Sequence, residues 1–469
     1  MKFKRPHLHV SDGEEKESSI WINEDIRPLP PSRRLWTKTT YISFWAINQI
    51  CISNWQQGSS LVSSGLSVWQ TMISIIIGKL IIAAVAILNG YVGAEWHIGF
   101  PVVSRMVWGV YGAYFQVVQR VVLSLVWFAV QSWTGPLLSA PAKAMSGTDL
   151  GWKIVQGVTT TIGGIAVGLS NQMDYCRFSR RPGDQVFGQW FSILLFGSIF
   201  PLFGCLTSSA TQKNYGEAIW NPPLVVQAWL DTDYNAKSRA GAFFAGVGLV
   251  ICQIAINSVD NAYSTGMDLA GLLPRWINIR RGAYIGLVLS IAMCPWELLS
   301  SAATFISVLS AYSVFLGPLI GIHICDYWVI RQRRIKLSDL YHGRPDGFFH
   351  YWHGINPRAF IAWACGFASQ LPGFANAINK KITVPVGCVR LYYLAFLVGF
   401  AISFSIFYVL SMVWPPEGVQ EIDEVDIFGT FSEDEAFGMG TAPRDHVFRR
   451  EVDYSCKDEN RVEAKAVEF

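Results

Sequence analysis

The sequence predicts an all-α polytopic membrane protein, and its composition and its apolar runs carry that prediction. Hydrophobic residues make up 51% of the 469 residues and charged residues only 15%, whereas a soluble globular chain carries about 25% charged residues. The low charge leaves long apolar runs, for example at 72–88 and 391–413. Each of these runs approaches the roughly 20 residues that cross a bilayer as a helix.

The apolar runs divide the chain into about ten expected spans. They lie at about 41–63, 68–92, 113–135, 150–172, 187–207, 240–264, 281–296, 303–328, 358–375 and 389–413. Polar residues, among them Asn48 and Asn54, interrupt the first span, and Gly163 and Gly164 weaken the fourth. Such a span is either a mistaken assignment or a discontinuous helix that lines a site.

Polar segments flank the expected transmembrane region, which covers residues 41–413. Residues 1–40 form a basic arm, and residues 414–469 form an acidic tail that we expect to be disordered. Arginines follow the fourth, sixth and eighth spans, on the same side as the arm. The positive-inside rule therefore places both termini in the cytoplasm.

Several classes of function and partner are not indicated. The net charge of +3 gives no sign of nucleic-acid binding, because the basic residues lie in short loops between spans. The nine cysteines show no metal-ligand spacing. The chain contains no Walker loop, HExxH or GxSxG motif, so we expect neither an enzyme nor an ATP-driven pump. In the tail, Lys457 and Lys465 are candidate targets of a ubiquitin ligase, with an inert solvated tail as the alternative.

Trp127 and Gln131 lie four residues apart in the third expected span, so they share one face of a helix. An aromatic ring beside an amide suits a flat ligand, because the ring stacks on it while the amide hydrogen-bonds its edge. The alternative is an ordinary membrane helix with an interfacial Trp and a Gln bonded to a neighbouring helix. Taken alone, the two residues favour that alternative.

The segment Trp127-Phe-Ala-Val-Gln131-Ser-Trp133 is one of several motifs that occur together along the chain. The others are Trp21-Ile-Asn23-Glu-Asp25-Ile-Arg-Pro28, His97-Ile-Gly-Phe-Pro101, Asn171-Gln-Met-Asp174-Tyr-Cys-Arg177-Phe178, Tyr215-Gly-Glu-Ala-Ile-Trp220, Ile277-Asn278-Ile-Arg280-Arg281-Gly282 and Cys294-Pro295-Trp296. In combination they resemble the nucleobase–cation symporter family, in the uracil/allantoin permease branch found in fungi. The resemblance extends from about Trp21 to Pro415.

The resemblance implies a leucine-transporter-like fold, in which two inverted five-helix repeats hold the substrate between discontinuous helices. It implies that Trp127 stacks on the substrate ring and that Gln131 hydrogen-bonds it. It also implies that Asn261 binds substrate, because Asn257 and Asn261 match a pair of asparagines in the family's corresponding span. The substrate would then be nucleobase-like, and no cofactor is expected beyond a coupling cation.

The chain departs from the family in its number of spans, about ten where members usually have about twelve. Trp133-Thr134-Gly135 runs directly into Pro136-Leu-Leu-Ser-Ala-Pro141, which resembles the family segment just before its sixth span. We therefore expect two helices to be absent between Gly135 and Pro136. Such a loss preserves the sidedness of the later loops, but it leaves a packing face exposed.

Polar and charged residues within the spans are candidates for coupling and gating. A carboxylate inside a bilayer is costly and usually functional, so Asp260 in the sixth expected span is a candidate proton-coupling site. The alternatives are a hydrated cavity or an ion pair with Lys79 of the second span. Asn48 and Asn54 of the polar first span are further candidates for the ion path or the gate.

Two more carboxylates stand at the ends of expected spans. Asp174 lies near Arg177 and Asp326 near Arg331, so we interpret both as salt bridges that anchor or gate the helix ends. His323 lies within the eighth span, where a hydrogen-bonded core histidine is the plain interpretation and a proton relay is the alternative.

The sequence therefore predicts a proton-coupled secondary transporter of the plasma membrane that imports a nucleobase-type substrate such as uracil or allantoin. Two alternatives stay open, a non-transporting truncated paralogue and a nucleoside or thiamine transporter of the same family. The coupling ion also stays open, because the family includes sodium users.

Overall fold

The computed structural model describes residues 18–132, 147–294, 302–379 and 381–444. Within these ranges the regular structure is helical, and strand-like pairing is limited to isolated bridges such as the one between Trp36 and Ser179. This confirms the predicted all-α class. The junction of Gly135 and Pro136, where two helices are expected to be absent, lies outside the described residues.

The first half of the chain forms a series of helices, two of which continue after a break. They are α1 (Lys38–Gln49), α2 (Ile52–Ser63), α3 (Val68–Trp96), α4 (Phe100–Trp108), α5 (Gly112–Ser132), α6 (Gly147–Gly163), α7 (Ala166–Ser170), α8 (Gln172–Cys176) and α9 (Asp184–Tyr215). A single 3₁₀ turn, η1 (Pro31–Arg33), precedes them.

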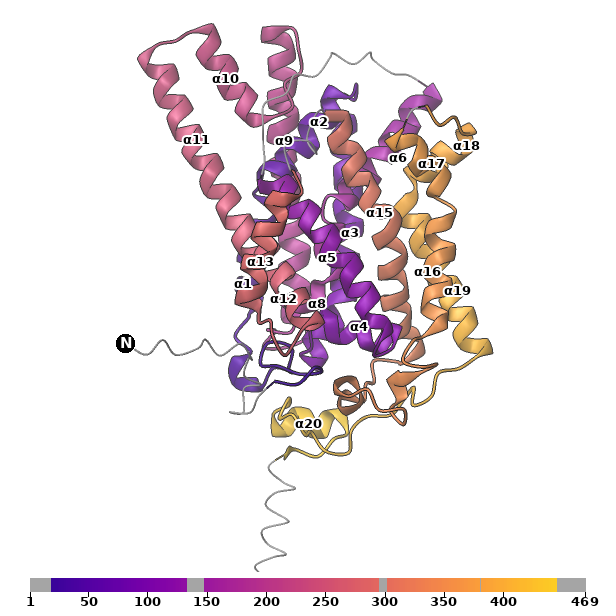
Figure 1. The fold of residues 1–469 in the computed structure, drawn as a ribbon. Helices are drawn as coiled ribbons and strands as arrows, with labels where there is room; N and C mark the ends of the chain where they lie inside the picture. The colour runs from indigo at the N-terminus through magenta and orange to yellow at the C-terminus, as the bar shows by residue number, and fades with distance from the viewer. Residues whose placement is uncertain (1–17, 133–146, 295–301, 380, 445–469) are drawn as a thin grey trace, which may run out of the picture.

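The second half contains two π-helical turns within longer helices. Its elements are α10 (Pro222–Thr232), α11 (Ala236–Ile256), the π-helical η2 (Asn257–Ala262), α12 (Tyr263–Leu272), α13 (Ile279–Ala292), α15 (Ala302–Ile324), the π-helical η3 (Cys325–Ile330), the 3₁₀ turns η4 (Leu337–Tyr341) and η5 (Phe348–His350), α16 (Pro357–Ala368), α17 (Leu371–Ile378), α18 (Val386–Tyr393), α19 (Ala395–Val413) and α20 (Glu433–Met439). Figure 1 shows the N-terminal arm and α20 at the same end of the helix bundle.

Six helices in the described ranges are long and apolar enough to cross a membrane. They are Val68–Trp96, Gly112–Gln131, Asp184–Tyr215, Ala236–Leu272, Ser307–Ile330 and Ala395–Val413. The other expected spans are helical too, but they are short or interrupted: α1 with α2, α6 with α7, α13, and α16 with α17. The chain is thus a membrane protein with several spans, and the number of about ten stays a prediction.

Both polar spans contain a break in the helix. α1 ends at Gln49 and α2 begins at Ile52, with Cys51 in an extended conformation between them (φ −142°, ψ 160°). α6 ends at Gly163, and a short irregular segment separates it from α7. Gly163 packs so closely on α15 that a Cβ atom there would lie 1.8 Å from the Leu309 carbonyl oxygen. The structure therefore favours the discontinuous-helix interpretation of these two spans.

α11 packs against the rest of the bundle far less than other long helices do. Only 6% of the apolar window in Ala236–Leu272 is buried, compared with 83% in Ser307–Ile330. Figure 1 shows α10 and α11 leaning away from the bundle at one end. Large apolar side chains, among them Phe244 and Val250, are exposed along α11. An exposed packing face of this kind is what the sequence predicts if two helices are absent.

Part of the C-terminal tail differs from the expected disorder. Residues 414–444 follow a defined path that includes α20. Phe428 and Phe431 of this segment pack against the main hydrophobic core, and Arg34 of the arm donates to Glu435 at 2.8 Å. The apolar contacts with the core and the ionic contact with the arm order a segment that its acidic composition alone marks as disordered. The remainder of the tail, with both candidate ubiquitination lysines, lies outside the described residues.

Candidate functional site

Three helices meet at the break between α1 and α2. Gln131, at the end of α5, donates through Nε2 to Ser53 Oγ in the first turn of α2 at 3.0 Å. Asn257 of η2 donates to the backbone carbonyl oxygen of Gln131 at 3.4 Å. Gln253 of α11 donates to the same oxygen at 2.5 Å. The structure thus places Gln131 and Asn257 in contact and adds Ser53 and Gln253 to them.

The asparagine pair lies in a π-helical turn, η2, which is rare and occurs frequently at functional sites. Asn261 donates through Nδ2 to Asn257 Oδ1 at 2.7 Å. Because Asn257 also contacts Gln131, a chain of hydrogen bonds runs from Ser53 to Asn261. Each amide in this chain has both donors and acceptors, so a ligand with a mixed polar edge can exchange for these bonds.

Trp127 lies one turn before Gln131 on α5 and is buried. Its ring meets Tyr312 of α15 edge-on, with ring centroids 5.9 Å apart and 81° between the planes. The Tyr312 hydroxyl donates to the Leu123 carbonyl oxygen at 3.1 Å, which fixes this second ring. The site therefore has two aromatic walls at nearly a right angle.

A cavity of about 710 Å³ opens between α2, α5, α11 and α13. Its lining is mostly apolar and consists of Ile52, Phe128, Pro223, Val226, Gly246, Leu249, Val250, Gln253, Ile254, Asn257, Ser258, Ala262, Ala283, Tyr284 and Leu287. The volume is within the range of about 300–1,000 Å³ that is usual for small-molecule sites. Of the four predicted substrate contacts, Asn257 alone is among these described lining residues, and Trp127, Gln131 and Asn261 are buried.

Asn54 belongs to a buried polar cluster at the same helix break. Lys79 of α3 donates to Gln49 Oε1 at 2.8 Å and to Asn54 Oδ1 at 3.0 Å. One ammonium group thus joins the last residue of α1 to the first turn of α2. Asn48 instead donates to the Phe44 carbonyl oxygen of its own helix at 3.1 Å. Of the two candidates from the first span, Asn54 is therefore the one that lies at the break.

Asp260 occupies the same π-helical turn as the asparagines. It accepts a hydrogen bond from the Tyr175 hydroxyl of α8, with 2.5 Å between the oxygens. The alternative of an ion pair between Asp260 and Lys79 is wrong, because Lys79 is held by amide oxygens at the α1–α2 break. One helical turn thus carries both predicted asparagines and the candidate coupling carboxylate.

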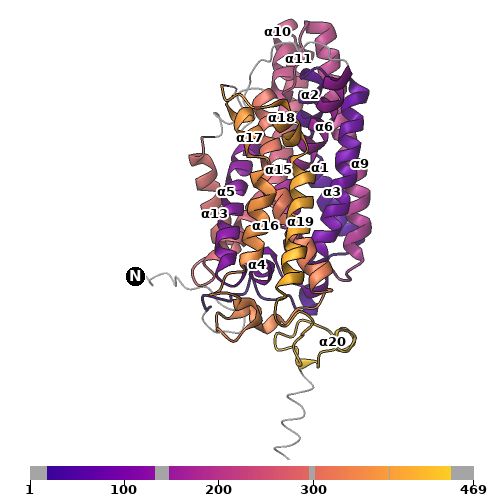
Figure 2. The same cartoon turned by 90° about the vertical axis from the view of Figure 1, so that its right-hand side faces the viewer.

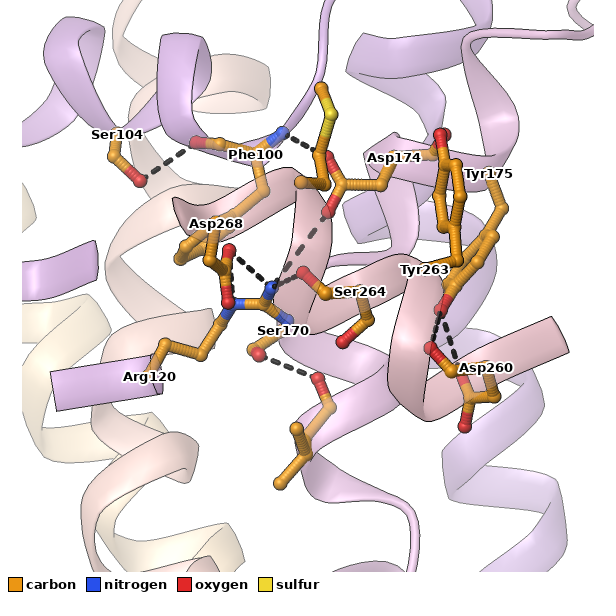
Figure 3. Close-up of polar contacts among 12 residues, drawn as sticks. Phe100, Ser104, Arg120, Ser170, Asp174, Tyr175, Asp260, Tyr263, Ser264 and Asp268 are labelled. Carbon is orange, nitrogen blue, oxygen red and sulfur yellow. Dashed lines mark hydrogen bonds and ion pairs between the residues drawn. The ribbon is translucent and has the colours of Figure 1, made fainter. Parts of the chain in front are cut away.

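A second buried cluster joins α5, α8 and α12 (Figure 3). Arg120 donates through Nε to Asp268 Oδ1 at 3.1 Å, and its Nη2 atom lies 3.9 Å from Asp174 Oδ2. Asp174 also accepts the Phe100 backbone amide at 2.6 Å. All three charged side chains are fully buried, and one guanidinium therefore serves two carboxylates.

The salt bridges expected at span ends form in one case and not in the other. Asp326 accepts Arg331 Nε at 2.9 Å, as predicted. The expected pair of Asp174 and Arg177 is wrong, because Arg177 donates instead to the backbone carbonyls of Asp25 and Arg27 in the arm, at 2.7 and 2.8 Å. Burial of the arm against the bundle offers Arg177 these partners, which spacing along the sequence cannot show.

Sequence reasoning missed several residues of these clusters. Arg120 could have been identified from the sequence, since a lone arginine in an apolar span is costly and usually paired. Ser53, Gln253 and Tyr312 could not, because the packing of α2, α11 and α15 against α5 brings them to Gln131 and Trp127.

Two broken helices, α1–α2 and α6–α7, with amide side chains buried at the first break, are the arrangement found in secondary transporters of the inverted-repeat kind. The sequence profile of permeases for cytosine/purines, uracil, thiamine and allantoin matches residues 28–150 and 134–399. The chain therefore belongs to this nucleobase–cation symporter family of membrane transporters. The two matched stretches meet at 134–150, beside the junction where helices are expected to be absent.

Relatives of the chain are transporters, in agreement with the prediction that it is not an enzyme. The transporter aclS of Aspergillus oryzae is 41% identical over 92% of this chain and 94% of the relative. That alignment runs over 576 positions, more than the 469 residues of this chain, so the relative carries segments that this chain lacks. The nicotinamide riboside transporter 1 of Saccharomyces cerevisiae is 26% identical over 96% of this chain and 89% of the relative. The uracil permease of the same yeast is 28% identical over 85% and 77%.

Among solved structures, the fold is similar to that of Mhp1, a nucleobase-cation-symport-1 family transporter in a closed conformation with bromovinylhydantoin bound. The TM-score is 0.67 at 19% identity, over 89% of this chain and 99% of the other. This likeness confirms the leucine-transporter-like fold that the family resemblance implies.

Proposed function

We propose that the chain is a plasma-membrane symporter that imports a nucleobase-type substrate, such as uracil or allantoin, together with protons. The observation that carries this proposal is the chain of hydrogen bonds in which Asn257 joins the Gln131 backbone carbonyl to the Asn261 amide, one turn from Trp127. A flat heterocycle would stack on the indole while its N–H and C=O groups exchange for bonds within the amide chain. The family and its uracil permease member support this class of substrate.

Proton coupling is assigned to Asp260, because this carboxylate shares η2 with the substrate asparagines. While it is ionised, Asp260 accepts the Tyr175 hydroxyl of α8. Protonation weakens that bond, since hydrogen bonds to ionised acceptors are roughly twice as strong as neutral ones. A proton on Asp260 would therefore loosen η2 from α8, and substrate binding and protonation would act on one helical turn.

In the proposed membrane topology both termini are cytoplasmic, and the arm and residues 414–444 pack together on that side. The lysines of the distal tail, Lys457 and Lys465, would then be accessible to a ubiquitin ligase.

Two other functions have specific support. A non-transporting shortened paralogue is favoured by the weak packing of α11, of which only 6% of the apolar window is buried. It is also favoured by the length of the alignment with the Aspergillus relative, which exceeds this chain. A nucleoside or thiamine transporter is favoured by the family description and by the nicotinamide riboside transporter among its relatives.

Uptake of labelled compounds separates these functions. The chain is expressed in a fungal strain without its own permeases, and uracil, allantoin, uridine, thiamine and nicotinamide riboside are offered singly. The proposal expects uptake of uracil or allantoin that a protonophore abolishes and that sodium does not restore. Uptake of a nucleoside or thiamine alone would identify a nucleoside or thiamine transporter. Absence of uptake by cells that carry the protein at their surface would establish the non-transporting alternative.

A further inference from the structure

A basic pocket of about 350 Å³ lies where α1 and α9 begin. It is lined by Thr37, Lys38, Thr39, Arg180, Arg181 and Asp184. Three of the six lining residues are cations and one is an acid, so the pocket has a net positive charge. It lies at the end of the bundle that also carries the N-terminal arm, apart from the amide chain and the Arg120 cluster.

The backbone fixes the shape of this pocket. The Trp36 amide donates to the Phe178 carbonyl at 3.0 Å, and the Arg180 amide donates to the Trp36 carbonyl at 2.9 Å. This short parallel bridge holds the segment before α1 beside the segment that carries both arginines. One turn further along, Gly188 of α9 packs so closely on α1 that a Cβ atom there would lie 2.3 Å from the Tyr41 Cβ. The two segments are therefore held together independently of the charged side chains.

The cations of the pocket are available to a ligand. Lys38, Arg180 and Arg181 are exposed, and none of them forms a salt bridge with another residue in the described part of the chain. The hydroxyls of Thr37 and Thr39 lie 2.9 Å apart at the same rim and add donors. Like charges held this close together repel unless an anion lies between them.

The neighbouring surface of α9 is apolar and aromatic. Phe187, Trp190 and Phe191 are 54%, 43% and 40% exposed, and the rings of Phe187 and Phe191 stack with centroids 5.9 Å apart. Phe187 and Phe191 lie three and seven positions after Asp184, so they continue the pocket's face of the helix, and Trp190 lies beside that face. α9 runs along one edge of the bundle in Figure 2, and its membrane-crossing stretch begins at Asp184. The pocket thus lies at the end of a helix that is long and apolar enough to cross a membrane, and the aromatic surface continues from the pocket along that helix.

We infer that this pocket binds the headgroup of an anionic phospholipid. The phosphate contacts Lys38, Arg180 and Arg181, and an acyl chain lies along Phe187 and Phe191. A soluble phosphate would use the cations alone and leave the aromatic surface unexplained, whereas a phospholipid uses both. Basic pockets at the membrane surface are known to select anionic lipids by this combination.

The test uses the full-length protein in neutral detergent, titrated with dioctanoyl phosphatidylserine, with bound lipid counted by native mass spectrometry. The double variant Arg180→Gln/Arg181→Gln removes two exposed cations that hold no side-chain partner among the residues that the structure describes. A matched control, Lys213→Gln/Lys237→Gln, removes two exposed cations at the far end of α9 and the start of α11. Each basic residue near the membrane surface contributes about a fivefold gain in affinity, so the double variant should bind about 30-fold more weakly while the control matches the unmodified protein.

Two comparisons complete the test. Dioctanoyl phosphatidylcholine should bind no better to the unmodified protein than to the double variant, because its headgroup is neutral overall. Inorganic phosphate should not displace phosphatidylserine, because it cannot use the aromatic surface. Equal binding of phosphatidylserine by the double variant and the unmodified protein would overturn the inference. Displacement by inorganic phosphate at matched concentration would overturn it in favour of a soluble anion.

Discussion

Lys79 of α3 donates a 2.8 Å hydrogen bond to Gln49, the last residue of α1. The same ammonium group bonds Asn54 in the first turn of α2. A side chain from a neighbouring helix therefore bridges the break that separates the two half-helices. Since Gln131 also reaches α2 through Ser53, the bridge holds one wall of the proposed substrate site in place.

Replacement of Lys79 by Met is expected to destabilise the protein, because it leaves the buried Asn54 Oδ1 without its donor and leaves Gln49 Oε1 with the Asn54 amide as its one remaining donor. Each unsatisfied group costs about 1–3 kcal/mol, so a clear fall in the thermal unfolding temperature in detergent is expected. Lys213→Met, at an exposed position of α9, is the control and should leave that temperature unchanged. A Lys79→Met protein as stable as the control would show that the hydrogen bonds of Lys79 do not stabilise the junction between α1 and α2.

The Arg120 cluster predicts non-additive effects of substitution. Arg120→Met leaves Asp174 and Asp268 buried without a cation, and breaking a buried pair in this way costs about 3–5 kcal/mol. The double variant Arg120→Met/Asp268→Leu removes one of the two stranded carboxylates, so it should be more stable than Arg120→Met alone. Thermal unfolding of both variants beside the unmodified protein measures the difference. Equal or greater loss in the double variant would contradict the cluster as described.

The contact of the tail with the arm predicts a dependence on pH. Burial acts to raise the pKa of Glu435, but hydrogen bonds from the Ser432 amide and the charge of Arg34 outweigh burial and lower the pKa. Because the pKa of Glu435 is lowered in the folded state, its ionised carboxylate stabilises the docked tail at pH values above the ordinary pKa of 4.5. That stabilisation is lost as the pH falls through the pKa of the folded state. Protection from hydrogen exchange across residues 431–442, expressed relative to the intrinsic exchange rate at each pH, should therefore be high at neutral pH and lower in acid.

Glu435→Gln tests the same contact at neutral pH. The amide keeps the size of the side chain but loses its charge, so protection across residues 431–442, relative to the intrinsic exchange rate, should fall at pH 7 and lose most of its dependence on pH. Glu421→Gln, an exposed acid of the same segment, is the control. Exchange unchanged from the unmodified protein in Glu435→Gln would rule out the Arg34 contact as the cause of docking.

The bond between Tyr175 and Asp260 predicts a shift in the pH profile of transport. Tyr175→Phe removes the hydroxyl that stabilises the ionised carboxylate, so Asp260 should hold its proton to higher pH and the profile of uptake should move in the alkaline direction. Tyr408→Phe changes an exposed tyrosine of α19, outside the cavity, and serves as the control. A profile that stays in place in Tyr175→Phe would remove Asp260 from the coupling scheme.

The sequence was most informative where periodicity and composition decide the structure. Apolar runs marked the long helices, and polar interruptions near Asn54 and Gly163 marked the two broken ones, because such interruptions are tolerated only where the backbone lines a cavity or is covered by protein. The order of α20 was not foreseen, since it depends on contacts of Phe428 and Phe431 with the main core rather than on local composition.

Side-chain partners were predicted less well, for a geometric reason. The four-residue spacing of Trp127 and Gln131 put them on one face, but the partner of each comes from another helix, Tyr312 for the ring and Ser53 for the amide. Nearness along the chain suggested Arg177 for Asp174, whereas helix packing brings Arg120 to it instead. Pairings between distant helices need the packed structure.

Gln131 and Asn261 are proposed to bind a nucleobase-type ring. Equilibrium binding of the labelled substrate identified by uptake, measured on purified Gln131→Ala and Asn261→Ala proteins, tests it most directly. Gln420→Ala, at an exposed amide of the tail, is the control. Loss of one hydrogen bond of about 1 kcal/mol or more predicts binding roughly five- to tenfold weaker in each of the two variants and unchanged in the control. Binding as tight in both variants as in the control would contradict the account.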